Sequence, residues 1–425
     1  MRHALYIRFF TVALCFIAAG LMSCIDESLR EDRSPQDPTE GTDDGSEMEI
    51  IREVTDPEAA LATANCMLIV PGGRVSIPIA KAFAVWTEYR PLLGKVSLKG
   101  DLAPVLLWAY PEDLIDMDEL DITDYEDINK AAITVRASKD RMGSALIALA
   151  VDGTIRWSWH IWVTDYIPGM DLQPGSLAIG SNDVTGGKVY RYKNKAGDNI
   201  FMDRDLGAFP REYAEYGYNG MSYQWGRKDP FPGFAPLNFT PIKDGTVPEP
   251  QTPATYEETN MAYAIEHPDE MIAHGRRNDW YSYIEGNYDD DLWGGVSRKK
   301  TIWDPCPEGW RIPWYGEPLM VEGPYGYLIV DRSQSPIWVL EDENQFIDFT
   351  SPILGTWSND AYLYHDTGEP NATAERPPFY WSGSSYPPDV HHTNGCIMRW
   401  DVSAEYHFKG DAMHVRCVRD ISSYK

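Results

Sequence analysis

Residues 143–162, which read GSALIALAVDGTIRWSWHIW, are the stretch that decides the fold class. An unbroken apolar run reaches Val151, the dipeptide Asp152-Gly153 follows, and a second run rich in aromatic residues leads to Trp162. Asp-Gly between two such runs is typical of a β-hairpin turn, because both turn residues adopt positive φ. The stretch therefore predicts a buried antiparallel hairpin.

Several further short β segments precede this hairpin. Apolar or alternating runs occupy residues 65–70, 74–79, 105–108 and 133–135, and Pro and Gly separate the first two. Short strands at this spacing are typical of a sandwich. We therefore expect a β-sandwich domain over residues 55–165.

The sequence changes in character after Asp165, where longer loops alternate with dense aromatic islands. The chain contains 15 Trp, 25 Tyr, 34 Gly and 31 Pro, a mixture that suits short strands and many turns better than a helical bundle. Residues 256–274 are the best helical candidate, although Pro268 interrupts them. The fold class expected for the whole chain is mainly β, or α+β.

The first 24 residues have the features of an export signal. Arg2 and Arg8 precede an apolar run that is too short for a membrane-spanning helix. Residues 21–24 (LMSC) resemble the bacterial lipobox, which implies cleavage before Cys24 and acylation of its thiol with fatty acids such as palmitate. Each buried methylene contributes about 0.8 kcal/mol, so several acyl chains hold a protein on a bilayer. The competing interpretation is an ordinary signal peptide with a chance cysteine.

An acidic segment follows Cys24. Residues 25–49 contain ten acids and almost no apolar side chains, so they cannot offset their chain entropy by burial. We expect a disordered tether over residues 25–54. Removing the two arginines of the signal takes the formal net charge from −28 to −30. A chain this acidic repels nucleic acid and anionic lipid headgroups.

A series of short phrases along residues 62–420 resembles one family architecture. The phrases are residues 64–66 (ANC), 157–162 (WSWHIW), 202–208 (MDRDLGA), 223–231 (YQWGRKDPF), 304–313 (DPCPEGWRIP), 380–384 (YWSGS) and 415–420 (VRCVRD). Together they resemble the Bacteroidales fimbrillin-like surface lipoproteins that carry a Fibrobacter succinogenes major paralogous domain. Asp205 departs from that pattern, in which Asn is usual. The resemblance implies a C-type-lectin-like domain with long loops over residues 166–425.

The resemblance also implies a cellular role. It leads us to expect a non-enzymatic lipoprotein on the cell surface, anchored in the outer membrane through acylated Cys24 and serving as a fimbrial subunit or adhesin. The acids after Cys24 are also similar to the export signal of surface-exposed Bacteroidetes lipoproteins, although a plain spacer would look the same. Expected partners are outer-membrane lipid, other pilus subunits, and host or dietary glycans. The alternative is a glycan-binding module for polysaccharide capture, because aromatic loops suit sugar stacking.

Four cysteines follow the lipidated one. The resemblance implies a disulfide between Cys306 and Cys417, because a late strand of lectin-like folds returns beside an earlier element. Cys396 is the competing partner for Cys417 across a local hairpin. Cys66 alternates with apolar residues, so we expect a buried free thiol.

The aromatic islands are interpreted as scaffold. Arg204, Arg227 and Arg311 each have aromatic or acidic neighbours in sequence, which suits stacking and bidentate pairing. The same residues would also suit a ligand surface.

The motifs for catalysis and metal binding are weak. Residues 369–371 (EPN) match the tripeptide that ligates calcium and sugar in some C-type lectins, but residues 357–360 (WSND) precede them, the reverse of the lectin order. The sequence has no GxSxG, HExxH or CxxC motif. We therefore expect no catalytic residue, no metal site and no cofactor, and any glycan binding would use loops of the C-terminal domain without calcium.

Overall fold

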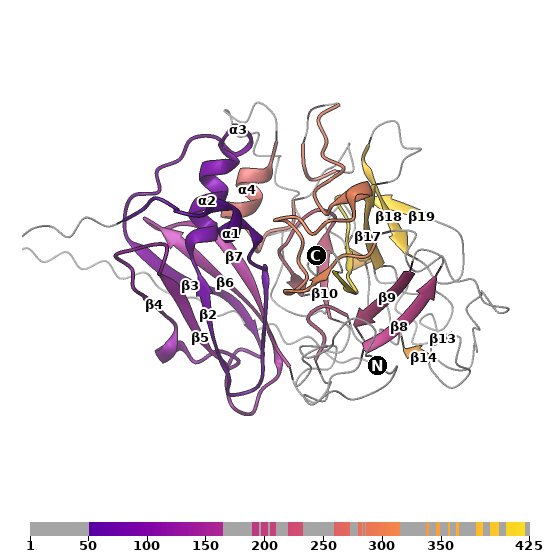
Figure 1. The fold of residues 1–425 in the computed structure, drawn as a ribbon, viewed down its shortest axis with the longest axis horizontal. Coiled ribbons are helices and arrows are strands. Elements are labelled where there is room, and N and C mark those ends of the chain that lie inside the picture. The colour runs from indigo at the N-terminus through magenta and orange to yellow at the C-terminus, as the bar shows by residue number, and fades with distance from the viewer. Residues whose placement is uncertain are drawn as a thin grey trace, which may run out of the picture. The chain divides into compact units, whose positions relative to one another are not determined.

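The structure is a computed structural model, in which Met1–Glu47 and Met48–Lys425 form two separate units. It describes residues 51–164, 189–194, 197–202, 205–209, 220–232, 259–272, 279–282, 284, 286–314, 337–339, 346–348, 356–357, 363–364, 380–385, 392–398 and 405–420, all within the second unit. Most of the described secondary structure is β-sheet, with a few short helices (Figure 1). This confirms the coarse fold class, mainly β.

The predicted hairpin forms the centre of the first sheet. Strands β6 (Gly143–Val151) and β7 (Thr154–Val163) pair antiparallel along their whole length. Asp152 and Gly153 between them have φ of 50° and 76°, so both turn residues adopt the positive φ that the dipeptide predicts. Every residue of β6 is buried, which explains its continuous apolar sequence.

Two sheets use strands of the first 164 residues. One has the order β1 (Cys66–Ile69), β7, β6 and β3 (Leu102–Tyr110), with β1 parallel to β7. The other has the order β2 (Arg74–Pro78), β5 (Ala132–Arg136) and β4 (Asp121–Thr123). The predicted short strands are therefore present.

Short helices, which the sequence interpretation missed, interrupt these strands. They are α1 (Pro57–Ala62), α2 (Ala80–Glu88), α3 (Arg90–Leu93) and the 3-10 turn η1 (Met117–Glu119). Helix α2 is buried from Ala80 to Trp86, so it lacks the polar face that signals an amphipathic helix in a sequence.

The folded part begins earlier than expected. We assigned residues 25–54 to the tether, yet Ile51 pairs with Asp127 as a parallel bridge and its amide donates to the carbonyl of Glu126 at 2.8 Å. Backbone pairing at Ile51 therefore corrects the end of the tether.

The remaining strands form three sheets. Eight described strands form the largest, in the order β11 (Phe231–Pro232), β10 (Met221–Gln224), β20 (Ala412–His414), β17 (Tyr380–Ser385), β18 (Asn394–Met398) and β19 (Glu405–Phe408). Strand β15 (Thr356–Trp357) also pairs with β20, and β16 (Leu363–Tyr364) pairs with β15. A second sheet contains β12 (Trp310–Arg311), β21 (Val418–Arg419), β9 (Gly197–Met202) and β8 (Val189–Asn194). Strands β13 (Ile337–Val339) and β14 (Phe346–Asp348) pair with each other, and a 3-10 turn, η4, spans Gly295–Ser297.

Helix α4 (Met261–Glu266) is shorter than the helix predicted over residues 256–274. It ends before His267, one residue ahead of Pro268, because the residue before a proline disfavours the helical conformation. Helix α4 contacts β7 and α3 (Figure 1). Glu266 of α4 forms an ion pair with Arg156 of β7.

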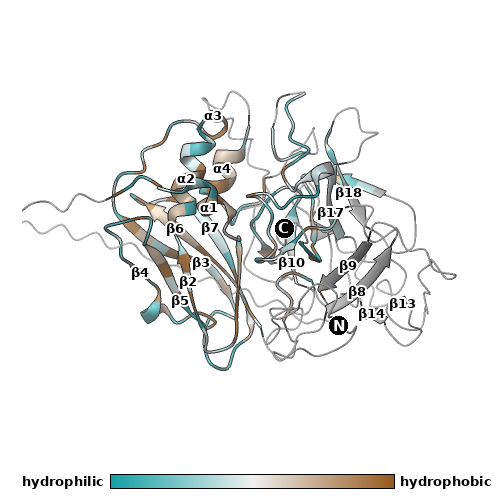
Figure 2. Ribbon diagram, in the orientation of Figure 1, coloured by the Kyte–Doolittle hydropathy of each residue, from teal (hydrophilic) through white to brown (hydrophobic). Residues whose placement is uncertain are grey.

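One hydrophobic core runs through both parts of the described chain. It contains Trp157 and Trp159 of the first sheet together with Trp225, Trp280 and Trp381 from later segments. Figure 2 shows hydrophobic colours along strands of the first part and hydrophilic colours on many of its loops. Within the described residues, no sheet mixes strands from before and after residue 165, and an isolated bridge joins Cys66 to Pro307.

Candidate functional site

The expected lipidation site and the lectin-type tripeptide lie outside the described residues. This holds for Cys24 and for residues 369–371, and of residues 357–360 only Trp357 is described, in β15. In the described ranges, no three His, Cys, Asp or Glu side chains gather in a way that could hold a metal ion. None of the described helices has the length and apolar character of a membrane span.

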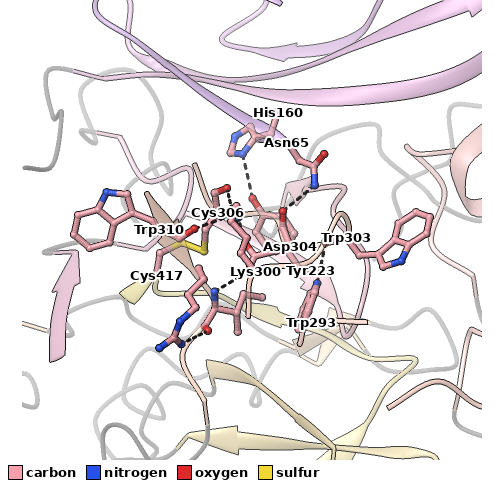
Figure 3. The surroundings of a disulfide bond; sticks show 12 residues. Asn65, His160, Tyr223, Trp293, Lys300, Trp303, Asp304, Cys306, Trp310 and Cys417 are labelled. Atoms are coloured by element: carbon pink, nitrogen blue, oxygen red, sulfur yellow. Dashed lines mark hydrogen bonds and ion pairs between the residues drawn. A yellow bond between two sulfur atoms is a disulfide. The ribbon is translucent and has the colours of Figure 1, made fainter. Parts of the chain in front are cut away.

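A disulfide joins Cys306 and Cys417 (Figure 3). The antiparallel pairing of β12 with β21 brings these two segments together across 111 residues, and the Cα atoms lie 6.0 Å apart. This is the pair that the resemblance implies. Cys66 and Cys396 are free and buried. Burial raises the pKa of the Cys396 thiol to about 12, so it stays protonated and unreactive near neutral pH.

Lys300 organises the loop that holds Cys306. Its ammonium donates to the carbonyls of Cys306 and Trp310 at 2.7 and 2.8 Å, and it pairs with the Asp304 carboxylate at 2.7 Å (Figure 3). The same carboxylate accepts from the amides of Cys306 and Ile312. The side chains of Lys300 and Asp304 therefore hydrogen-bond two carbonyls and two amides of this loop. This is a scaffold role for residues 304–313.

Asn65 connects the first part of the chain to this loop. Its side-chain amide donates to the carbonyl of Asp304 at 2.8 Å (Figure 3) and to that of Ile302 at 2.7 Å. Its oxygen accepts from the indole of Trp157 at 3.3 Å. The contacts to Asp304 and Trp157 are buried and the one to Ile302 is partly buried, so Asn65 positions one part of the core against the other.

His160 lies in a buried chain of hydrogen bonds. The Ser144 hydroxyl donates to the carbonyl of Gly207, so we assign Nε2 of His160 as donor to Ser144 Oγ, and Tyr223 donates to Nδ1; both contacts to the ring are 3.1 Å. Burial lowers the pKa of His160 to about 3. The imidazole is therefore neutral, and its two nitrogens connect β6 and β7 to β10.

The segment 227–229 carries three buried charges. Lys228 donates to the carbonyl of Ser158 at 3.1 Å and pairs with Asp229, while the Ser158 hydroxyl donates to that carboxylate at 2.6 Å. Burial lowers the pKa of Lys228, although the Asp229 carboxylate opposes the shift. Arg227 donates to the oxygen of Gln224 and lies over the Trp280 ring. These residues join β7 to later segments.

Of the other two arginines in the aromatic islands, the structure describes Arg311 but not Arg204. Arg311 donates to the carbonyl of Ile312 at 3.0 Å and lies 3.9 Å from the Asp420 carboxylate, and Arg204 lies outside the described residues. Arg227 and Arg311 are thus buried parts of the scaffold.

A group of exposed rings stands apart from this interior. Tyr288, Tyr406 and Phe408 are among the few large hydrophobic side chains that the described chain exposes, at 39%, 51% and 38%. Tyr288 stacks on the ring of His392, with centroids 3.7 Å apart and planes within 6°. We call these four side chains the exposed aromatic cluster.

One carboxylate and a buried lysine connect His392 to the end of β19. Asp290 accepts from Nδ1 of His392 at 2.6 Å and from Lys409 at 2.7 Å, so it connects the loop before η4 to β18 and β19. Lys409 is almost fully buried and lies 4.4 Å from the centre of the Trp225 ring. Burial raises the pKa of nearby Asp279 to about 6, an effect that the Lys409 charge opposes.

Sequence reasoning did not select this cluster. His392, Tyr406 and Phe408 lie in no phrase of the family resemblance and in no catalytic or metal-binding motif. The available signal was the alternation of aromatic and polar residues at 405–409, which is typical of a strand with one exposed face.

No family model, curated protein or solved structure matches this chain.

Proposed function

We propose that the protein is a non-enzymatic lipoprotein of the outer cell surface, anchored in the outer membrane through acylated Cys24, and that it serves as an adhesin or fimbrial subunit. In this proposal residues 55–165 are a β-sandwich carrier and residues 166–425 a C-type-lectin-like binding domain. The lipobox and the acidic segment after it support the anchor and the exposed location.

The observation that carries the binding role is the exposed aromatic cluster. Most other large aromatic side chains described in the chain are buried, whereas Tyr288, Tyr406 and Phe408 face solvent near Asp290 and Lys409. Exposed aromatic side chains that gather around one strand pair favour an interaction site. Residues of the family-like phrases, such as Arg227 and Asp304, are instead buried in the scaffold.

The second candidate function is a glycan-binding module for polysaccharide capture. The composition of the cluster favours it, because Tyr, Phe and His rings supply both stacking faces and hydrogen-bonding edges. Both candidates share the anchor and differ in the ligand.

Membrane fractionation tests the anchor. We expect Cys24→Ser to release the protein from the outer membrane, because the acylated thiol is the proposed attachment. Ser23→Ala is the matched control, since it keeps a small residue before the cysteine and should remain in the membrane. Protease treatment of intact cells should digest the anchored protein if it faces outward. Pelleting of Cys24→Ser with the outer membrane would contradict the anchor.

Shearing of intact cells separates the two surface roles. A fimbrial subunit leaves with the sheared filaments, whereas an adhesin or capture module stays with the membrane. The distribution of the protein between the two fractions decides which role applies.

A further inference from the structure

We infer that the exposed aromatic cluster is a calcium-independent binding site for neutral polysaccharide. This inference rests on the proposed binding role and names its ligand class. It concerns Tyr288, His392, Tyr406 and Phe408, which lie around the β18–β19 pair, and it makes no use of residues 357–360 or 369–371.

The strand geometry aligns two of the rings. Tyr406 and Phe408 are two residues apart in β19, so their side chains project from the same side of the sheet, roughly 7 Å apart along the strand. The register pairs them with Cys396 and Asn394 of β18. Two rings at this spacing offer a flat surface on which successive sugar rings of an extended chain can stack.

The opposite side of the strand pair anchors this surface. Gly395 and His407 are paired in the register, and Gly395 lies so close to Trp225 that an added Cβ would be 2.5 Å from the indole. Lys409 also lies over that indole. Gly395 and Lys409 therefore face the interior, whereas Tyr406 and Phe408 project from the other side of β19 and are 51% and 38% exposed.

The Tyr288–His392 pair lies beside the same end of the β18–β19 pair and adds polar groups, because Lys409 donates its amide to the carbonyl of Thr393. Lys409 follows β19 directly, and its ion pair with Asp290 connects the strand to the loop that carries Tyr288. Asp290 also fixes His392, which remains about one-third exposed. A stacked ring pair beside partly exposed imidazole and carboxylate groups can contact both the apolar face and the hydroxyls of a sugar.

The charge of the protein decides between glycan classes. The mature chain carries a formal charge of −30, and residues 289–291 place three aspartates beside the cluster. Uronate-containing or sulfated glycans would be repelled. A neutral polysaccharide incurs no such penalty, because its contacts are stacking and hydrogen bonds.

The side chains of the cluster favour a sugar over a protein partner. Between residues 380 and 420, the large hydrophobic side chains that are described as exposed are aromatic, namely Tyr406 and Phe408. Among the four members none is aliphatic, although protein interfaces bury aliphatic side chains in their cores. Aromatic rings match the flat apolar faces of pyranoses.

Affinity electrophoresis of the full mature chain tests the inference. The probes are soluble neutral polysaccharides, namely amylopectin, xyloglucan, arabinoxylan and yeast mannan, with polygalacturonate as the anionic comparison. We expect retardation by at least one neutral probe, none by polygalacturonate, and the same result with a chelator or with added calcium. The double variant Tyr406→Ala/Phe408→Ala should weaken binding roughly tenfold or more.

Tyr125→Ala provides the matched control, because Tyr125 is an exposed tyrosine in the first part of the chain. It should leave binding unchanged, and thermal unfolding should show that all variants are folded. Absence of retardation by every neutral probe would overturn the inference, as would full binding by the folded double variant, dependence on calcium, or a preference for polygalacturonate. None of these outcomes affects the Cys24→Ser fractionation, so the two proposals fail separately.

Discussion

At the scale of the residue, some polar side chains of this protein each satisfy several backbone groups. Asn65 reaches carbonyls more than 230 residues away, and Lys300 fills a position between three oxygens of one loop. Since an unpaired buried polar group costs about 1–3 kcal/mol, each of these side chains constrains the segments it contacts.

His160 gives a prediction for acid pH. Its folded pKa of about 3 lies below the unfolded value near 6.5, so the unfolded chain binds one more proton between these values. The contribution of His160 to stability should therefore be complete above pH 6.5 and should fall by up to about 1.4 kcal/mol per pH unit below it.

The measurement compares the wild type with His160→Asn by denaturant unfolding from pH 7 to pH 3. Asparagine keeps an acceptor near the Tyr223 hydroxyl and does not titrate, so the difference isolates His160 from other groups. We expect the stability advantage of the wild type to shrink steadily as the pH falls. A difference that stays constant with pH would contradict the buried neutral imidazole.

At the scale of the element, β18 depends on a residue without a side chain. Gly395 faces the Trp225 indole, and a Cβ there would lie 2.5 Å from one ring carbon and 2.9 Å from another. Trp225 cannot move aside easily, because it is fully buried and donates to the carbonyl of Ser382 at 2.9 Å.

Gly395→Ala should therefore destabilise the protein by about 1–3 kcal/mol, the usual cost of overpacking a filled core. The control is Gly153→Ala in the β6–β7 turn, where no atom lies within 4 Å of the added Cβ and the cost is the backbone strain of about 1–2 kcal/mol. Because Gly395 also positions β19, its variant should weaken glycan binding, which Gly153→Ala should leave intact. Equal binding by the two variants would contradict the role of β18.

At the scale of the whole molecule, the disulfide closes a long loop within the later part of the chain. Loss of this link in Cys306→Ala/Cys417→Ala should cost about 4–5 kcal/mol in the chain-entropy model, because the cysteines are 111 residues apart. The single variant Cys396→Ala removes a free buried thiol and should cost less. Unfolding under non-oxidising conditions measures both, and an equal loss in the two variants would contradict the assignment.

The sequence by itself determined features that depend on neighbouring residues. The Asp152-Gly153 turn, the apolar run of β6 and the strands near residues 65–79 were predictable because turn conformation and strand alternation are local properties. The mainly β class followed from the same signals. The resemblance, rather than the spacing, pointed to Cys306 and Cys417.

Tertiary structure alone decided the buried helix α2, the parallel placement of β1 beside β7 and the exposed aromatic cluster. Helix α2 has no polar face that would identify it as a helix in the sequence, because the core surrounds it. The cluster exists because Asp290 meets Lys409, a residue 119 positions later, and no local pattern records that pair. Contacts of this kind form only when segments far apart in the sequence come together in the folded protein. The fold therefore decided which aromatic residues are buried and which are exposed.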